Sequence, residues 1–327
     1  MNMILKLISP AFLMTLAWNY PINDNAKDKS SVEKEWVMDQ TRKYSPDSWD
    51  LLLQYESLPE KMEAEAADGR IATNVHEIAH AYCGLNIFRH ANENGLKLDM
   101  NKAEEFFYCS PCKSFFVSFP LKSLFPSREL KAVIPGNLRT FRFNTYIGGI
   151  TATQPEGVIG LLNELHSYYL ESKFCLEMLE PYKTAEGSDA SGFFEWVHNS
   201  QSKMTAFYEF DFFIKEYLLY MKGKYPARYN ELRSYRPFTE AYRTIRISYE
   251  ELVNDYLQKI KTEMAALNSS GKAEITLEGT DLWVREGNND TSAGTPVFSK
   301  DFEILKPVLE SDRYQEIVDD FPVLGIK

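Results

Sequence analysis

Two imidazoles and a carboxylate stand close together in the stretch VHEIAHA at residues 75–81. On a helix, residues four apart share a face with Cβ atoms about 5–6 Å apart, so His76 and His80 can reach one zinc ion at about 2.0–2.1 Å each. Glu77 lies about 100° around the helix from His76, where its carboxylate can hold a metal-bound water. The pattern therefore predicts a zinc hydrolase that activates water. The alternative is a core helix whose two histidines bond to backbone carbonyls.

A catalytic zinc ion normally has three protein ligands and a water, so the chain must supply a third ligand. We expect Glu164 in this role, because it lies in an apolar run where an isolated acid is costly unless a cation meets it. Pairing of this acid with an Arg or Lys is the alternative. Thr153 and Glu156 form a T-x-x-E capping box that predicts where the helix begins. Glu104 and Glu105 are the second choice of ligand, in a segment that we interpret as a solvated helix face.

The HExxH motif at 76–80, followed by a second apolar helix with Glu164 at its centre, resembles the gluzincin class of zinc metallopeptidases. In that class two histidines and a downstream glutamate hold one zinc ion, and the glutamate of HExxH acts as general base. The resemblance implies that His76, His80 and Glu164 are metal ligands and that Glu77 is the catalytic base. It covers these two helices, and their separation along the chain is longer than in thermolysin-like enzymes.

Cleavage of a peptide bond also needs a donor for the oxyanion that develops on the attacked carbonyl. Tyr168 is the first candidate, because it lies four residues after the proposed third ligand and shares its face. His166, Tyr146 and His198 rank below it. The expected substrate is a peptide or protein, and the glutamate of the motif would move the proton from water to the leaving amine. A catalytically inactive zincin-like binding module with structural zinc and a metal-free helical interaction protein are the alternatives.

The expected fold class is α+β and mainly helical. We expect a zincin-like catalytic core over 41–180, which holds the active-site helix and a small β element. A large, mainly helical C-terminal lobe over 181–327 follows, with a short β-hairpin near 273–286 and then a final helix.

Finer patterns predict individual elements within these parts. Aromatic and β-branched runs predict strands at 114–119 and 139–147, and the second of these runs alternates polar with apolar residues. Either strand could bind an extended peptide along its edge, although a plain packing hairpin explains the pattern as well. Periodic apolar residues predict helices over 192–221 and 248–267.

The amino terminus predicts export. Residues 1–17 resemble a short secretory signal peptide, with an apolar stretch and small residues before a possible cleavage point. The polar segment 18–40 is then expected to be a flexible lead-in. The apolar stretch is too short to span a bilayer, so we expect a secreted or periplasmic protein without an integral membrane span. The alternative is an N-terminal helix that packs on the domain.

Charge and cysteine usage narrow the partners and the chemistry. The formal net charge of -11 argues against a nucleic-acid partner, because such proteins gather Lys and Arg on one face. Cys109 and Cys112 form a CxxC motif for which a local disulfide is the modest expectation. Cys83 and Cys175 fall near the proposed ligands, so they are expected to be neighbours and could be bonded if the two helices meet at zinc.

Overall fold

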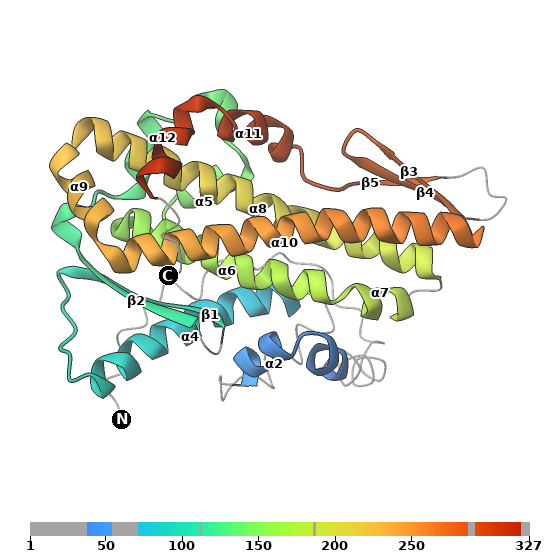
Figure 1. Ribbon diagram of the computed structural model, residues 1–327, viewed down its shortest axis with the longest axis horizontal. Coiled ribbons are helices and arrows are strands. Elements are labelled where there is room, and N and C mark those ends of the chain that lie inside the picture. Colours follow the sequence, from blue (N-terminus) through green and yellow to red (C-terminus); the bar gives the residue numbers. More distant parts are fainter. Residues whose placement is uncertain (1–37, 54–70, 111–112, 186–187, 287–291, 322–327) are drawn as a thin grey trace.

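The computed structural model describes residues 38–53, 71–110, 113–185, 188–286 and 292–321. Helices dominate these residues, and the strands form two small antiparallel sheets (Figure 1). The mainly helical α+β class expected from the sequence is therefore confirmed. The expected signal peptide and nearly all of the expected lead-in lie outside the described residues.

The chain runs through its helices and strands in the following order. The first half contains α2 (Pro46–Leu53), α4 (Ile71–Glu93), β1 (Lys102–Ser110), β2 (Lys113–Pro120), α5 (Phe141–Tyr146), α6 (Val158–Glu177) and α7 (Leu179–Ala185). The second half contains α8 (Asp189–Lys224), α9 (Pro226–Ser234), α10 (Arg236–Ser270), β3 (Ala273–Glu278), β4 (Asp281–Glu286), β5 (Ala293–Pro296), α11 (Asp301–Leu309) and α12 (Asp312–Asp320). Short 3-10 turns connect β2 to α5 and α5 to α6, the last of them being η7 (Gln154–Glu156). One continuous hydrophobic core joins side chains from α2 to α12.

Helix α6 is the central helix of the fold. It packs against α4 on one side and against α8 and α10 on the other, and Figure 1 shows it between these helices. Nearly every residue of α6 is buried, whereas α10 buries one stripe of residues at helical spacing. A helix that is buried all round must find internal partners for its polar side chains. The buried polar residues of α6 therefore need such partners: Asn163, Glu164, His166, Ser167, Glu171 and Ser172.

The start of α6 differs from the expected capping box. Thr153 caps the 3-10 turn η7 without a side-chain hydrogen bond, and α6 begins at Val158 after Gly157, whose φ of 58° favours glycine. A Cβ at Gly160 would lie 2.1 Å from the carbonyl oxygen of Thr153, so only glycine lets the preceding loop lie this close to the helix. The close approach leaves the Thr153 hydroxyl free to reach further along α6.

The strand expected at 139–147 is wrong, because this segment forms helix α5. Arg142, Phe143 and Ile147 are buried, whereas Phe141 is 72% exposed. Alternation would have put Phe141 and Phe143 on the same face, so the burial follows a helical period. The backbone N–H of Arg142 also donates to Glu209 of α8, a contact between distant parts of the chain.

Other expected elements are found where the sequence places them. β2 covers the strand expected at 114–119, β3 and β4 form the expected hairpin, and α8 and α10 contain the helices expected over 192–221 and 248–267. The segment with Glu104 and Glu105 is strand β1, paired antiparallel with β2, so its interpretation as a helix face is wrong. Two short helices, α11 and α12, stand in place of the single final helix.

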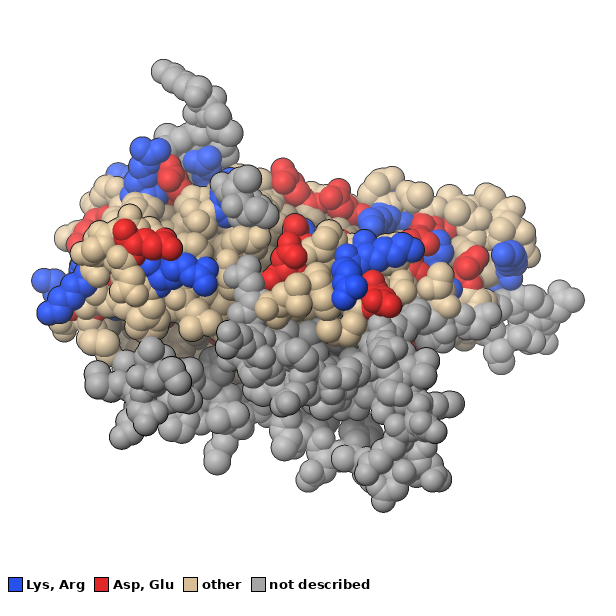
Figure 2. Space-filling model, turned by 90° about the horizontal axis from the view of Figure 1, so that it is seen from below, with Lys and Arg blue, Asp and Glu red and all other residues tan. Residues whose placement is uncertain are grey.

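Surface and cysteine features complete the fold. None of the described helices combines the length and the apolar character that a membrane span requires. On the face shown in Figure 2, the described Lys and Arg side chains lie among Asp and Glu side chains. Cys83 and Cys175 are buried free thiols, so the expected bond between them is wrong. Cys109 is likewise a free thiol, so the local disulfide expected for it is wrong, and Cys112 lies outside the described residues.

Candidate metal centre

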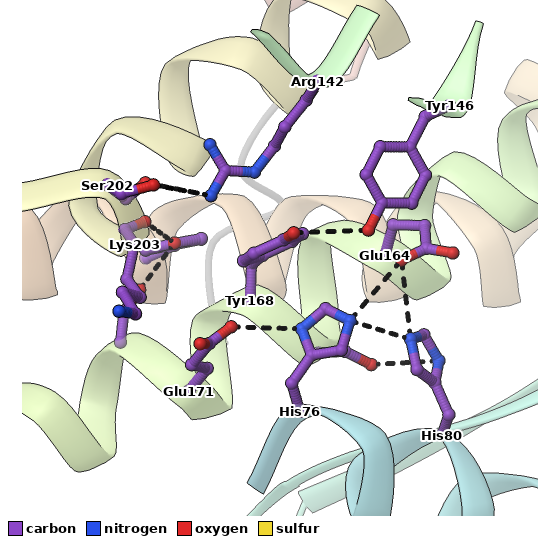
Figure 3. Close-up of polar contacts among 12 residues, drawn as sticks. His76, His80, Arg142, Tyr146, Glu164, Tyr168, Glu171, Ser202 and Lys203 are labelled. Atoms are coloured by element: carbon purple, nitrogen blue, oxygen red, sulfur yellow. Dashed lines mark hydrogen bonds and ion pairs between the residues drawn. The ribbon is translucent and has the colours of Figure 1, made fainter. Parts of the chain in front are cut away.

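The packing of α4 against α6 brings the three expected ligands together. His76 and His80 project from successive turns of α4, and Glu164 projects toward them from α6 (Figure 3). Glu164 Oε2 lies 3.7 Å from His76 Nε2 and 3.4 Å from His80 Nε2, and the two Nε2 atoms are 3.1 Å apart. One nitrogen or oxygen from each residue therefore points at a common position.

The spacing of these atoms suits a metal ion. Tetrahedral coordination with bonds of about 2.0–2.1 Å puts neighbouring ligand atoms about 3.3 Å apart, and the observed 3.1, 3.4 and 3.7 Å bracket this value. Two imidazole nitrogens and one carboxylate oxygen are donors that zinc accepts. Within the part of the chain that the structure describes, His76, His80 and Glu164 are the group of His, Cys, Asp or Glu residues able to hold an ion. The residues present therefore fit a bound divalent metal.

One face of α6 also supplies partners for the far sides of the two histidines. His80 Nδ1 lies 3.1 Å from the hydroxyl of Ser167, and His76 Nδ1 lies 3.3 Å from a carboxylate oxygen of Glu171. Together with Glu164, these residues follow the i, i+3, i+7 spacing of a single helix face. A single helix thus provides the third ligand and a contact behind each imidazole.

The second oxygen of Glu164 is held from the loop before the helix. The hydroxyl of Thr153 donates to Glu164 Oε1 at 3.1 Å, which leaves Oε2 facing the imidazoles. The close approach of backbone at Gly160 makes this contact possible. Thr153 therefore orients the carboxylate of Glu164, whereas the sequence predicts it as part of a capping box with Glu156.

Electrostatics keep the carboxylate ionised in the chain without metal. Burial alone would raise the pKa of Glu164, but the adjacent rings of His80 and His76 outweigh it and hold the pKa at about 2. For His76 burial lowers the pKa, yet the carboxylates of Glu164 and Glu171 raise it well above its ordinary value. A metal ion must therefore displace a proton from His76, as expected for a site whose ligands bind in their deprotonated forms.

Tyr168 lies at the edge of the cluster. Its ring packs edge-on against His76 with centroids 4.4 Å apart, and its hydroxyl lies 3.2 Å from the hydroxyl of Tyr146 (Figure 3). The guanidinium of Arg142 stands 4.4 Å from the centroid of the Tyr168 ring and pairs with Glu209. Burial, followed by the neighbouring Glu164 carboxylate, raises the pKa of Tyr146 far above its ordinary value, so this phenol keeps its proton. Both tyrosines named from the sequence are therefore close to the ligands.

Glu77 differs from its neighbours on α4 because its side chain is exposed. It directly follows His76 in the chain, so it lies where the ligand helix meets solvent. Glu77 is not part of the group of side chains that could hold an ion, so the structure gives it no role as a metal ligand.

The two remaining histidine candidates lie elsewhere. His166 is fully buried, with Nε2 2.6 Å from the carbonyl oxygen of Tyr108 and Nδ1 4.0 Å from the sulfur of Cys83. Burial lowers the pKa of His166 to about 4, so it is a neutral core histidine. His198 Nδ1 contacts the hydroxyl of Thr295 on β5. Among the described residues, neither belongs to the group that could hold an ion.

The alternative ligands Glu104 and Glu105 have other partners. Glu104 accepts hydrogen bonds from the hydroxyl of Ser118 and a backbone N–H. Glu105 is buried and accepts from the side-chain amide of Asn163 at 2.8 Å. It also pairs with Glu156: burial and this neighbour raise the pKa of Glu105, and burial raises that of Glu156 to about 7. Both carboxyl groups are therefore easier to protonate than in water.

Three contributing residues were not singled out from the sequence for their roles at the centre. Thr153 was assigned to a helix cap, and Ser167 and Glu171 were not assigned. The signal for the last two was present in the sequence, because both lie at helical spacing from Glu164 within an apolar run. The partner of Thr153 depends on a loop conformation that local sequence does not specify.

Comparisons with known proteins add no relative to this picture. No protein-family model, no curated protein and no solved structure matches the chain. The geometry of the centre is therefore the basis on which a function can be inferred.

Proposed function

We propose that this chain is a zinc-dependent peptidase that hydrolyses peptide bonds at the centre formed by His76, His80 and Glu164. The observation that carries the proposal is the convergence of two imidazole nitrogens and one carboxylate oxygen at 3.1 to 3.7 Å. The group has three members among the described residues. Structural zinc sites usually have four protein ligands, whereas catalytic sites have three and leave a position for water or substrate. The donor set thus supports a catalytic centre.

The residues around the ligands support a hydrolytic reaction. When bound, zinc would supply a Lewis acid that polarises the substrate carbonyl and makes water more acidic. Glu77, exposed beside His76, would take a proton from the attacking water and return it to the leaving amine. Tyr146, whose phenol keeps its proton, would donate a hydrogen bond to the oxyanion in place of Tyr168, the first candidate from the sequence, and Tyr168 would orient Tyr146 through the contact between their hydroxyls.

The arrangement of elements agrees with the gluzincin resemblance and a zincin-like core. The HExxH motif lies on one buried helix, α4, and the glutamate ligand lies on a second, α6, which packs against it. The β1–β2 hairpin packs on α4, where an extended peptide could pair with a strand edge. A peptide or protein is therefore the proposed substrate.

An inactive binding module with structural zinc is the second candidate, and one observation favours it. The ligand side chains are mostly buried, with 6%, 12% and 7% of their surface exposed for His76, His80 and Glu164. A centre this enclosed would hold zinc without giving a large substrate much access. Activity and zinc content must therefore be measured on the same preparation.

The proposal is tested with Glu77→Gln and a matched control, Glu93→Gln, at the exposed end of the same helix. Elemental analysis should find one zinc per chain in wild type and in both variants. Cleavage of a mixed peptide library, followed by mass spectrometry, should be lost only in Glu77→Gln, by about 10²-fold or more for removal of a general base. Zinc without cleavage in wild type supports the binding module, and absence of zinc from wild type contradicts both candidates.

A further inference from the structure

The two imidazoles of the centre are backed by chemically different groups. His76 Nδ1 faces the carboxylate of Glu171 at 3.3 Å, and both residues are about 95% buried, being 5% and 4% exposed. His80 Nδ1 faces the hydroxyl of Ser167 at 3.1 Å. Both partners come from the same face of α6, and Figure 3 shows Glu171 beside His76 on the side away from Glu164. The two histidines are therefore inequivalent in their surroundings.

The identity of the backing group affects how strongly a histidine binds metal. An imidazole that presents Nε2 to a metal carries its proton on Nδ1, and an acceptor at Nδ1 fixes that tautomer and makes Nε2 more basic. A carboxylate accepts only, and its charge strengthens the hydrogen bond. A serine hydroxyl can donate or accept, so Ser167 gives His80 a weaker constraint. His76 Nδ1 is a buried atom without a hydrogen bond of good geometry, and the carboxylate oxygen of Glu171 at 3.3 Å is placed to accept its proton and fix the tautomer.

The charge of the loaded centre also depends on Glu171. A divalent ion with two neutral imidazoles and the Glu164 carboxylate carries a net charge of about +1 inside the protein, and an uncompensated buried charge is costly. The carboxylate of Glu171, 3.3 Å from His76, brings the set to neutrality. The buried guanidinium of Arg142 is paired with Glu209. Glu171 is thus the group that balances the ion.

We propose that Glu171 is a positioning residue that sets the zinc affinity of the centre through His76, and that Ser167 makes a smaller contribution through His80. This inference rests on the proposed function, because it assumes that the three ligands bind zinc. It assigns two residues that do not touch the metal, and it predicts that their effects are unequal.

The test compares zinc dissociation constants of the full-length chain, stripped of metal and titrated in competition with a chromophoric chelator. Glu171→Gln should weaken zinc binding by about 10- to 100-fold, the range for loss of a partner behind a metal-bound histidine, and Ser167→Ala by less than about 10-fold. Glu177→Gln is the matched control on the same helix, because its carboxylate contacts Ser45 and Lys173 instead of a histidine. It should leave the dissociation constant unchanged.

Cobalt substitution distinguishes an effect of Glu171 on the metal ligands from a general effect on folding. The visible absorption of bound Co²⁺ reports the ligand field, so the Glu171→Gln spectrum should shift while the Glu177→Gln spectrum matches wild type. If Glu171→Gln does not fold, Glu171→Asp keeps the charge on a shorter side chain and should still weaken zinc by at least about fivefold.

The outcomes separate this inference from the proposed function. Wild type that binds zinc, together with Glu171 variants within twofold of its affinity, overturns the role of Glu171 and leaves the zinc centre intact. Equal losses in Glu171→Gln and Ser167→Ala overturn the proposed inequality. Wild type that binds no zinc overturns both the inference and the proposed function.

Discussion

Replacement of Glu164 by glutamine should abolish zinc-dependent stabilisation of this protein. Glutamine keeps the size of the side chain and its contact with Thr153 but removes the charge that faces His76 and His80. A neutral amide is a poor ligand for zinc, so the variant should neither bind the ion nor gain stability from it.

The stability that Glu164→Gln should lose has two sources, bound zinc and the ionised carboxylate. Zinc at 100 times its dissociation constant stabilises the folded chain by about 2.7 kcal/mol. An unfolding entropy of about 2.1 cal/mol/K per residue gives about 0.7 kcal/mol/K for 327 residues, so this zinc should raise the wild-type Tm by about 4 °C. In the metal-free chain, a pKa of Glu164 held at about 2 instead of 4.5 corresponds to about 3 kcal/mol of stability. That stability is present above pH 4.5, is lost as the pH falls toward 2, and is absent from the variant at every pH.

The assay is thermal unfolding near neutral pH, with and without zinc after treatment with chelator. Glu105→Gln is the matched control, because Glu105 is another buried glutamate near the centre. Its pKa is raised, so the neutral amide of glutamine resembles the protonated form of this side chain. The control should keep the full zinc-dependent rise in Tm. A rise in Glu164→Gln equal to that of wild type, or loss of the rise only in Glu105→Gln, would refute the assignment of the third ligand.

Three further predictions concern the surroundings of the centre. Tyr146→Phe should lower kcat for peptide cleavage by about 10²- to 10³-fold, the range for loss of one oxyanion donor. Tyr168→Phe should lower kcat by no more than about 10-fold. Equal losses of kcat in the two variants would contradict these roles. Because the fold raises the pKa of Glu156 from 4.5 to about 7, the folded chain binds more protons than the unfolded chain between these values. Stability should therefore fall as pH rises through this window, and urea midpoints should show a flatter profile for Glu156→Gln. Arg142→Met leaves Glu209 as an uncompensated buried charge and should cost about 3–5 kcal/mol in urea unfolding, whereas a cost below about 1 kcal/mol would show that the ion pair is not needed.

The convergence of His76, His80 and Glu164 could be predicted because the physical reasons for it are local. The spacing of His76 and His80 specifies a shared helix face, and the cost of burying Glu164 in an apolar run indicates that it needs a cationic partner. The mainly helical class and the β3–β4 hairpin follow equally from periodicity and turn chemistry. Local patterns were sufficient for these features.

The remaining features depend on contacts between distant residues. Alternation at 139–147 fits a strand, but the fold places Arg142 on Glu209 and buries Phe143, and the segment becomes a helix. Glu105 is on a strand because β1 pairs with β2, which a charged stretch of sequence does not reveal. The partner of Thr153 likewise depends on the approach of a loop to α6. These features could not be predicted without the three-dimensional packing.

Gly160 influences how many oxygens of Glu164 would be available to a metal ion. Because no side chain separates this turn of α6 from the preceding loop, a hydroxyl occupies one oxygen of the carboxylate and leaves the other for the ion. With Oε1 accepting this hydrogen bond, Glu164 would offer Oε2 to an ion, and binding through one oxygen would keep a coordination position available to an exogenous molecule. A methyl group at position 160 would push the loop away and allow the carboxylate to chelate through both oxygens, filling that position without altering a single ligand.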